Sequence, residues 1–227
     1  ARVIQGANKV IAIGYRAAET AMYSNTGGNQ IFIGSETAQY VGYANLATGD
    51  NNIFIGTHAG RHITYASQNT VVGHMAYGRL GGSGQHEVSG SDVTAFGYAA
   101  GQYSTGSSNT FIGSEAGKGG QTSAPFSSGG SNTAIGRQAL DAFTTGHSNN
   151  AFGVAALGQV TTGQYNIGIG NSAGGAITTG QANVAISQDA LASNQATNDM
   201  IAIGFQAMYQ SNHACLLYTS DAADDDV

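Results

Sequence analysis

A seventeen-residue repeat is the feature of this sequence that most restricts its fold. Residues 131–181 divide into three lines of equal length, SNTAIGRQALDAFTTGH, SNNAFGVAALGQVTTGQ and YNIGIGNSAGGAITTGQ. Two looser copies follow, ANVAISQDALASNQATN and DMIAIGFQAMYQSNHAC. A unit of this length is too short for two packed helices or for a propeller blade. It suits one coil of a parallel β-solenoid.

The same repeat runs through the N-terminal half, where insertions lengthen it. One position per copy, the glycine after the apolar pair, serves as an anchor and recurs at Gly14, Gly34, Gly56, Gly73, Gly97, Gly113, Gly136, Gly153, Gly170, Ser187 and Gly204. We therefore expect an all-β chain folded as a parallel β-solenoid of about eleven rungs, on the order of 50 Å long at about 4.8 Å per stacked strand. The solenoid is expected over residues 1–208, regular in 131–208 and looser with insertions in 8–130, and residues 209–214 end the last repeat.

Other columns of the repeat have readable packing roles. The residue before the anchor is always apolar, as in Ile135, and the third residue after it is Ala in ten of eleven copies. One large and one small side chain per rung predict a continuous core. Asn recurs four residues before the anchor, at Asn52, Asn69, Asn109, Asn132, Asn149, Asn166 and Asn183. Its amide is expected to bond to the rungs above and below or to hold a turn. The Thr-Gly pairs such as Thr162-Gly163 predict a second corner.

A further column, two residues before the anchor, is also apolar. It lies on the opposite strand face from the residue before the anchor, and a strand that is apolar on both faces is buried on both. We assign the column that contains Ile135 to the inside of the coil and the other column to a subunit interface. The predicted interface residues are Phe32, Phe54, Val71, Phe111, Ala134, Ala151, Gly168 and Ala185. Their burial would stabilise an obligate oligomer wrapped about a rotation axis.

These motifs carry a resemblance to a known group of proteins. NTAIG, NNAFG, NIGIG, NVAIS and the linking TTG resemble the repeats of bacteriophage tail-fibre and tailspike-type proteins, and also the head repeats of trimeric autotransporter adhesins (YadA-like), over residues 8–208. The resemblance implies a left-handed β-roll, a homotrimer, and attachment to a host-surface glycan or protein. The adhesin unit is shorter, so the resemblance favours a tail fibre of a virion, with an adhesin head on the bacterial outer surface as the alternative.

Two other functions make different demands on the sequence. A glycan-degrading tailspike needs paired Asp or Glu side chains about 5 to 9 Å apart. The acidic residues upstream of residue 215 are scattered without a recurring pair, so we expect no enzyme and no cofactor. An ice-binding solenoid would need a flat Thr array in one column, and the Thr-Gly corner is missing from several rungs.

Two local motifs have less specific explanations. The stretch YNIGIGNSAGG spaces Gly168, Gly170 and Gly174 almost like a dinucleotide-binding loop, but no helical pattern follows it. His58 and His62 have the HxxxH spacing of a zinc site, but the Glu that a zinc protease needs after the first His is absent. We interpret the glycines as repeat positions and the two histidines as surface residues, and we expect no metal.

Two insertions are the candidate receptor loops. Residues 78–92 and 117–131 both fall between the Ala column and the next Asn column, so they are expected at the same edge of the solenoid. His86, Glu87, Gln121 and Phe126 are the candidate receptor contacts within them. The alternative is that both insertions are solvated loops without a partner.

Composition argues against nucleic-acid binding, membrane insertion and a disulfide framework. Seven scattered Lys and Arg residues give no footprint for nucleic acid, and no apolar run approaches the length of a membrane span, so neither partner is expected. The single Cys, Cys215, allows no disulfide within the chain. Residues 215–227 break every upstream pattern. CLLYTSDAAD, which opens this segment, resembles the translation of a sequencing-library adaptor, with a real acidic tail as the alternative.

Overall fold

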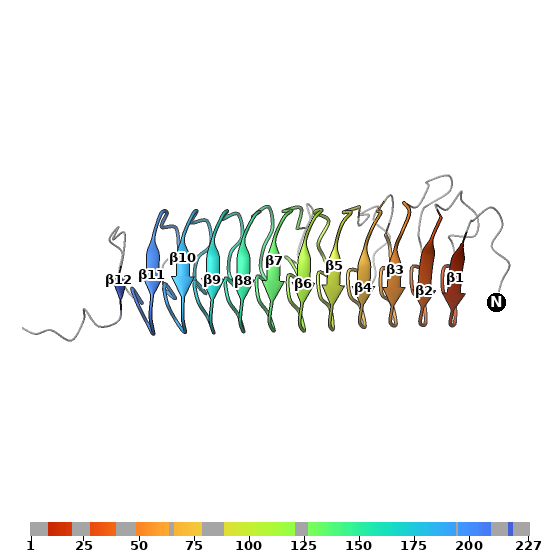
Figure 1. Ribbon diagram of the computed structural model, residues 1–227, viewed down its shortest axis with the longest axis horizontal. Coiled ribbons are helices and arrows are strands. Elements are labelled where there is room, and N and C mark those ends of the chain that lie inside the picture. Colours follow the sequence, from red (N-terminus) through yellow and green to blue (C-terminus); the bar gives the residue numbers. More distant parts are fainter. Residues whose placement is uncertain are drawn as a thin grey trace, which may run out of the picture.

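The protein is a straight rod built from one short strand per repeat (Figure 1). The computed structural model describes residues 9–19, 28–39, 49–63, 66–78, 89–120, 127–193, 195–209 and 218–219. The strands are β1 (Val10–Ile13), β2 (Gln30–Ile33), β3 (Ile53–Ile55), β4 (Thr70–Val72), β5 (Thr94–Phe96), β6 (Thr110–Ile112), β7 (Thr133–Ile135), β8 (Asn150–Phe152), β9 (Ile167–Ile169), β10 (Val184–Ile186), β11 (Ile201–Ile203) and β12 (Tyr218–Thr219). No helix occurs in these described ranges.

All strands belong to one parallel sheet whose order follows the sequence from β1 to β12. Equivalent repeat positions pair directly, as Ala134 does with Ala151 and Ala151 with Gly168. The insertions leave this register unchanged, since Val71 of β4 still pairs with Ala95 of β5 and Phe111 of β6 with Ala134 of β7. The predicted all-β, parallel β-solenoid with eleven repeats, β1 to β11, is confirmed.

The core lies inside the coil and is lined by the column two residues before the anchor, which we call the inner column. Its members Phe32, Phe54, Val71, Ala95, Phe111, Ala134, Ala151, Gly168, Ala185 and Ala202 are buried within the single chain. The Ala column three residues after the anchor is buried as predicted, for example at Ala139 and Ala156. The residue four after the anchor completes this opposite wall, as Leu140 and Leu157 do.

The prediction that the inner column forms a subunit interface is therefore wrong. Phe32, Phe54, Val71, Phe111, Ala134, Ala151, Gly168 and Ala185 face the interior of their own coil. The column immediately before the anchor, predicted to fill the core, points outward instead, and Ile13 is 58% exposed. The prediction that the two columns lie on opposite faces of the strand is correct. Which of two apolar columns lies inside does not follow from their hydrophobicity, and the predicted assignment of inside and outside is the reverse of the observed one.

Size complementarity explains why the inner column belongs inside. Where the inner column carries Phe, the residue six positions later is small: Phe54 is followed by Gly60, and Phe111 by Gly117. A Cβ added at Gly60 would come within 2.7 Å of the Phe54 ring. Where the inner column carries Ala, the same later position usually carries a large residue, as Leu157 does after Ala151. In these rungs the two walls compensate each other in size and fill the coil interior together.

The Asn column forms a buried side-chain ladder parallel to the rod axis. Asn149 Nδ2 donates to Asn132 Oδ1 at 3.2 Å and to the corner carbonyl of Gly163 at 2.9 Å. Asn149 Oδ1 in turn accepts hydrogen bonds from the backbone N and from Nδ2 of Asn166, both at 3.0 Å. The ladder therefore does both predicted jobs, because it joins adjacent rungs and holds the corner.

Sharp turns follow each strand and depend on unusual backbone angles. The ten anchor glycines have φ between +128° and +142°, and Ser187, the one anchor that is not glycine, has φ +97°. A Cβ at Gly113 would also stand 2.6 Å from the carbonyl oxygen of Gly136 in the next rung. Both the backbone angle and the stacking distance thus select glycine at this position.

The Thr-Gly corner is stacked as well. Thr144, Thr161 and Thr178 donate their hydroxyl hydrogens to the carbonyls of Thr161, Thr178 and Gln195 in the following rungs, at 2.9 to 3.1 Å. Backbone amides make the same connection, as between Thr161 N and Thr178 O at 2.8 Å. Hydrogen bonds therefore run from rung to rung at the sheet, at the turn and at the corner. Adjacent rungs are therefore hydrogen-bonded at three places around the coil.

Candidate functional site

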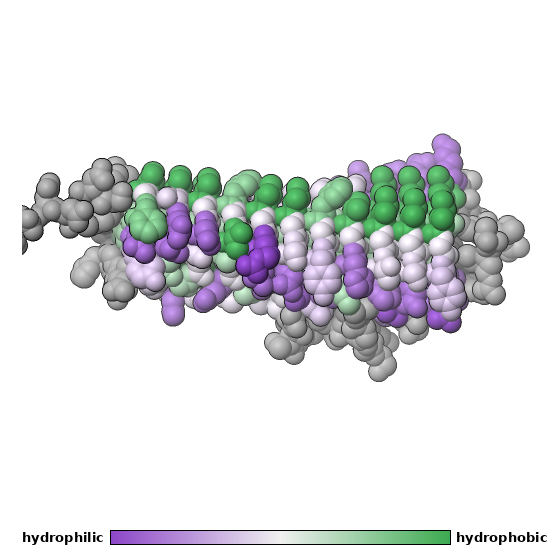
Figure 2. Space-filling view, turned by 90° about the horizontal axis from the view of Figure 1, so that it is seen from below, coloured by the Kyte–Doolittle hydropathy of each residue, from purple (hydrophilic) through white to green (hydrophobic). Residues whose placement is uncertain are grey.

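The outer face of the sheet is the largest candidate surface. It presents an outer apolar column of Ile13, Ile33, Ile55, Val72, Phe96, Ile112, Ile135, Phe152, Ile169, Ile186 and Ile203, one residue per rung. These side chains are exposed or half-buried, with Phe96, Ile169 and Ile203 each about 40% exposed. Figure 2 shows the apolar side chains as a green band along the upper edge of the rod, from end to end. Exposed apolar surface of this extent is typical of interaction sites in soluble proteins.

A second outward column lies beside the first, three residues before each anchor, and we call it the mixed column. It reads Ile11, Ile31, Ile53, then Thr70, Thr94, Thr110, Thr133, Asn150, then Ile167, Val184 and Ile201. The face is therefore apolar in both columns at the two ends of the rod and carries short polar side chains in the middle. The sequence pattern gave no prediction for this column. The size pairing between Phe111 and Gly117 could have identified the outer face, because it places the column that contains Phe111 inside the coil.

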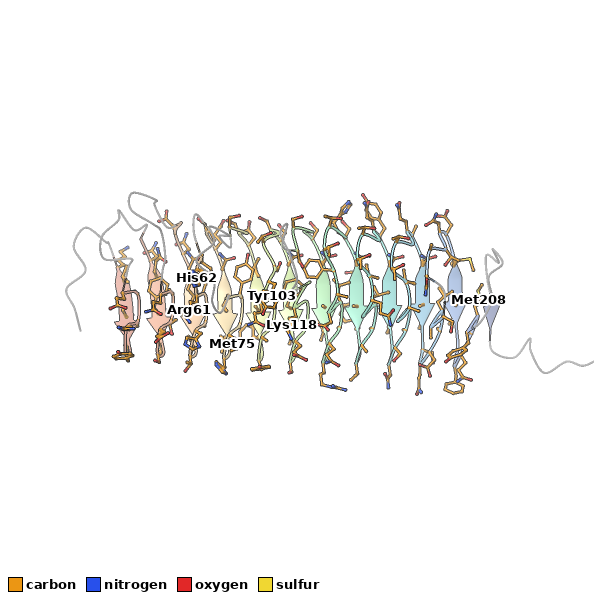
Figure 3. All side chains as sticks on the ribbon, turned by 180° about the vertical axis from the view of Figure 1, so that it is seen from behind. Arg61, His62, Met75, Tyr103, Lys118 and Met208 are labelled. Atoms are coloured by element: carbon orange, nitrogen blue, oxygen red, sulfur yellow. The ribbon has the colours of Figure 1, made fainter. Side chains whose placement is uncertain are left out.

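One flank of the rod carries a network of charged side chains. Glu36 Oε2 lies 3.1 Å from His58 Nε2 and 3.7 Å from Arg61. Further along, Lys118 Nζ binds Glu115 Oε1 at 2.7 Å. Figure 3 labels Arg61 and Lys118, the cations of these two pairs. The hydrogen bonds from Lys118 and Gln138 hold the pKa of Glu115 below its usual range. The pairs are partly exposed and contribute little to stability.

The structure explains the two motifs that resembled known sites. His58 and His62 lie in a turn with positive φ, not on a helix, and His58 contacts Glu36 and the ring of His74. The described residues contain no group of three or more His, Cys, Asp or Glu side chains placed to hold a metal ion. Gly170 and Gly174 occupy turns of one rung, and no helix follows them before residue 193. The histidine motif and the glycine motif therefore both adopt the ordinary turn conformation of the repeat.

A shallow hollow continues the same flank toward the C-terminal rungs. Its volume is about 420 Å³, and its lining includes the small residues Ala155, Gly158, Gly175 and Ala192. The other lining residues are polar or aromatic: Gln138, Asp141, Gln159, Ser172, Asp189 and Tyr209. Carboxylate, amide and hydroxyl groups in such a lining can form hydrogen bonds with a hydroxyl-rich ligand.

The two carboxylates of this hollow are not arranged for glycoside hydrolysis. Burial raises the pKa of Asp141 above its ordinary range, with Lys118 opposing the shift. Asp141 belongs to the β7 rung and Asp189 to the β10 rung, so about 14 Å of rod separates them at about 4.8 Å per rung. Glycosidases hold their two carboxylates roughly 5 to 9.5 Å apart. The hollow can bind a ligand but lacks this catalytic pair.

The candidate receptor loops cannot be compared with this surface. His86, Glu87, Gln121 and Phe126 lie outside the described residues, so their roles remain predictions. The strand and turn residues on either side keep the repeat register, since Val72 of β4 pairs with Phe96 of β5 across the first insertion.

Comparisons with known proteins add no relative to this description. No family model, no curated protein and no solved structure matches the chain. Among the described residues there is no helix long and apolar enough to cross a membrane. The surfaces of the solenoid itself are therefore the observations that bear on function.

Proposed function

We propose that this chain is a non-enzymatic structural and attachment segment of a phage tail fibre, in which three copies pack through their outer faces into a rigid rod. The observation that carries the proposal is the exposed apolar band along eleven consecutive strands. In a monomer this band would face water over the whole length of the solenoid. A second and a third copy of the chain would cover it.

The size of the face fits a specific protein interface. Two outward side chains from each of eleven strands form it, and standard interfaces use roughly 20 to 30 residues on each side. Three parallel rods about one axis bring each face against its two neighbours and close the assembly. Removing the apolar columns from water contributes about 25 cal/mol per Å².

The interior supports the mechanical part of the proposal. Hydrogen bonds connect successive rungs at the sheet, along the Asn ladder and at the Thr corner, as Asn166, Thr161 and Gly153 show. Such a rod is stiff along its length, which suits a spacer that holds a recognition element away from a virion. The polar hollow beside Asp141 and Tyr209 supports a host-surface glycan as its partner.

Two other functions remain open as proposals. A head domain of a bacterial trimeric adhesin would use the same outer face for assembly. An ice-binding solenoid is favoured by one observation, the stacking of Thr70, Thr94, Thr110 and Thr133 in one outward column. That function requires the face to remain open to water, so it predicts a monomer.

The mass of the protein in solution tests the proposal directly. Light scattering of the full chain should give three times the 22.9 kDa of one chain. A monomeric mass would contradict the trimeric rod, and thermal hysteresis of that monomer would support the ice-binding alternative. The genes beside the coding sequence separate the other two, because tail genes favour a fibre and a membrane-anchor domain favours an adhesin.

A further inference from the structure

The mixed column divides the outer face into three zones. It is apolar over β1 to β3, polar over β4 to β8 and apolar again over β9 to β11, with Thr70 and Asn150 as the first and last polar members. We infer that the polar zone sets the axial register at which copies of this chain pack against each other. The inference rests on the proposed trimer and names the feature that aligns its chains.

Within the part of the chain that the structure describes, the hydroxyls of the polar zone make no hydrogen bond. The corner residues Thr144, Thr161 and Thr178 donate to carbonyls of the next rung. Among the described residues, no such hydrogen bond is found for Thr70, Thr94, Thr110 or Thr133, whose side chains point outward and are only half-buried. The outward hydroxyls thus retain their hydrogen-bonding capacity for whatever covers the face.

Symmetry determines what each hydroxyl would meet. Rotation about an axis parallel to the rod leaves the height of every rung unchanged. Three chains so related present the same rung at each height, and the rung of Thr110 in one chain lies against the rung of Thr110 in the next. Rungs that are apolar in both columns then meet each other at both ends, while rungs with a polar member meet each other in the middle.

A slipped register breaks this match. A shift of one rung sets Thr70 of one chain against Ile53 of another, and Asn150 against Ile167. Each mismatch covers a polar group with methyl groups and removes its partner. The outer apolar column, which includes Ile112 and Ile135, does not resist such a slip because every rung offers an apolar side chain. The mixed column therefore has the role that a buried polar residue has in a coiled coil.

The pattern of the mixed column is symmetric about β6, so chain direction has to be tested separately. In an antiparallel pair β3 would face β9, and Ile53 would meet Ile167. In the parallel trimer Ile53 meets Ile53. The two arrangements are distinguished by single cysteines placed in these two strands, because about 29 Å of rod lies between them at about 4.8 Å per rung.

The first experiment uses the full chain with Cys215→Ser as background. Chains carrying Ile53→Cys and chains carrying Ile167→Cys are refolded together and treated with a short bismaleimide, and the products are identified by mass spectrometry. The parallel, in-register trimer gives 53-to-53 and 167-to-167 products. Cross-links between 53 and 167 would overturn the inference while leaving an oligomer in place, whereas a monomeric mass would overturn the proposed function as well.

The second experiment removes the polar zone. A variant with Val at positions 70, 94, 110, 133 and 150 keeps the shape of the outer face but loses its register signal. We expect unchanged β-sheet circular dichroism, a several-fold lower yield of the 53-to-53 product, and a mass distribution that spreads above three chains because staggered chains leave uncovered face at their ends. The matched control, with Ser at the four Thr positions, keeps the hydroxyls and should keep one mass. A valine variant that remains a single in-register trimer would refute the inference.

Discussion

At the scale of single residues, the rod depends on backbone conformations that few side chains tolerate. The anchor glycines combine positive φ with a neighbour directly in line with the missing Cβ. The next turn adds positive φ at two further positions of each rung, such as Gln138 and Leu140. These residues adopt that conformation because the interior packing and the inter-rung hydrogen bonds hold them there.

Substitution of one anchor glycine tests this explanation. Gly113→Ala places a Cβ 2.6 Å from Gly136 O at φ +133°, so the free energy of unfolding should fall by about 1–3 kcal/mol. Gly120→Ala is the matched control, because its Cβ would meet only Thr144 at an ordinary 3.5 Å and its φ is not positive. Denaturant unfolding of both variants measures the difference. Equal stability of the two would contradict the role assigned to the anchor.

The half-buried carboxylate of Asp141 predicts a pH effect. Burial raises its pKa above the ordinary value of 3.8, which means that folding penalises the charged form. At neutral pH, Asp141→Asn should therefore stabilise the fold, by less than about 1 kcal/mol because the group is partly solvated. The gain should disappear as the pH falls through the raised pKa and below 3.8, where the wild-type carboxyl is protonated in both states. A gain that stays constant with pH would argue against this cause.

At the scale of elements, the coil is a stack of columns whose members support one another between rungs. The Asn ladder shows this dependence, because the amides of its regular part, such as Asn149, Asn166 and Asn183, each bond to the rung before, the rung after and a corner carbonyl. Asn149 alone takes part in hydrogen bonds with Asn132, Asn166 and Gly163. Loss of one member therefore leaves partners on both sides without a bond.

Truncation of the ladder should be costly. Asn149→Ala leaves the backbone N of Asn166 and the carbonyl of Gly163 buried without these bonds, at about 1–3 kcal/mol for each unsatisfied group. Asn171→Ala provides the control, since the side chain of this exposed Asn bonds only to the neighbouring Ser172 among the described residues. Thermal unfolding should separate the two variants clearly. A small effect at Asn149 would show that water replaces the ladder.

The size pairing of the two core walls predicts that one substitution compensates the other. Phe111→Ala should lose about 3–5 kcal/mol of stability because it leaves a cavity, and Gly117→Leu alone should also destabilise because its Cβ meets the Phe111 ring. Together the two changes recreate the Ala-and-Leu pair that the β7 and β8 rungs already contain. The double variant should be more stable than either single one. Additive losses in denaturant unfolding would contradict the size pairing.

At the scale of the whole molecule, the rod has one apolar face, which the proposed trimer would cover. Its interior is complete within a single chain, as the buried columns around Phe143 and Val160 show. Folding of the coil and the proposed assembly of three copies are therefore separable. Charges on the outer face should block assembly without disturbing the coil.

A pair of outward substitutions tests this separation. Ile112→Lys with Ile169→Lys should leave the β-sheet circular dichroism intact and reduce the mass from three chains to one, because a lysine would be buried at the interface in each copy. Gln188→Lys, at an exposed position on the turn, should leave the mass unchanged. Conversely, Ala134→Lys places a charge inside the coil and should prevent folding. A trimer that survives both outer lysines would require a different interface.

Sequence alone determined the repeat, the eleven strands, their parallel order and the roles of the Ala and Asn columns. These features recur along the chain, since the Ala column holds Ala in ten of eleven copies and the Asn column holds Asn in seven, and a period of seventeen residues admits few folds. The tertiary structure decided which strand face is inside, because Phe111 and Ile112 are equally apolar and a period of two does not distinguish their faces. That choice follows from volume: the inner column must fit the opposite wall of its own coil, where Gly117 or Leu157 stands. The flank network and the hollow beside Asp141 also required the structure, since they join side chains from rungs that only the stacking brings together.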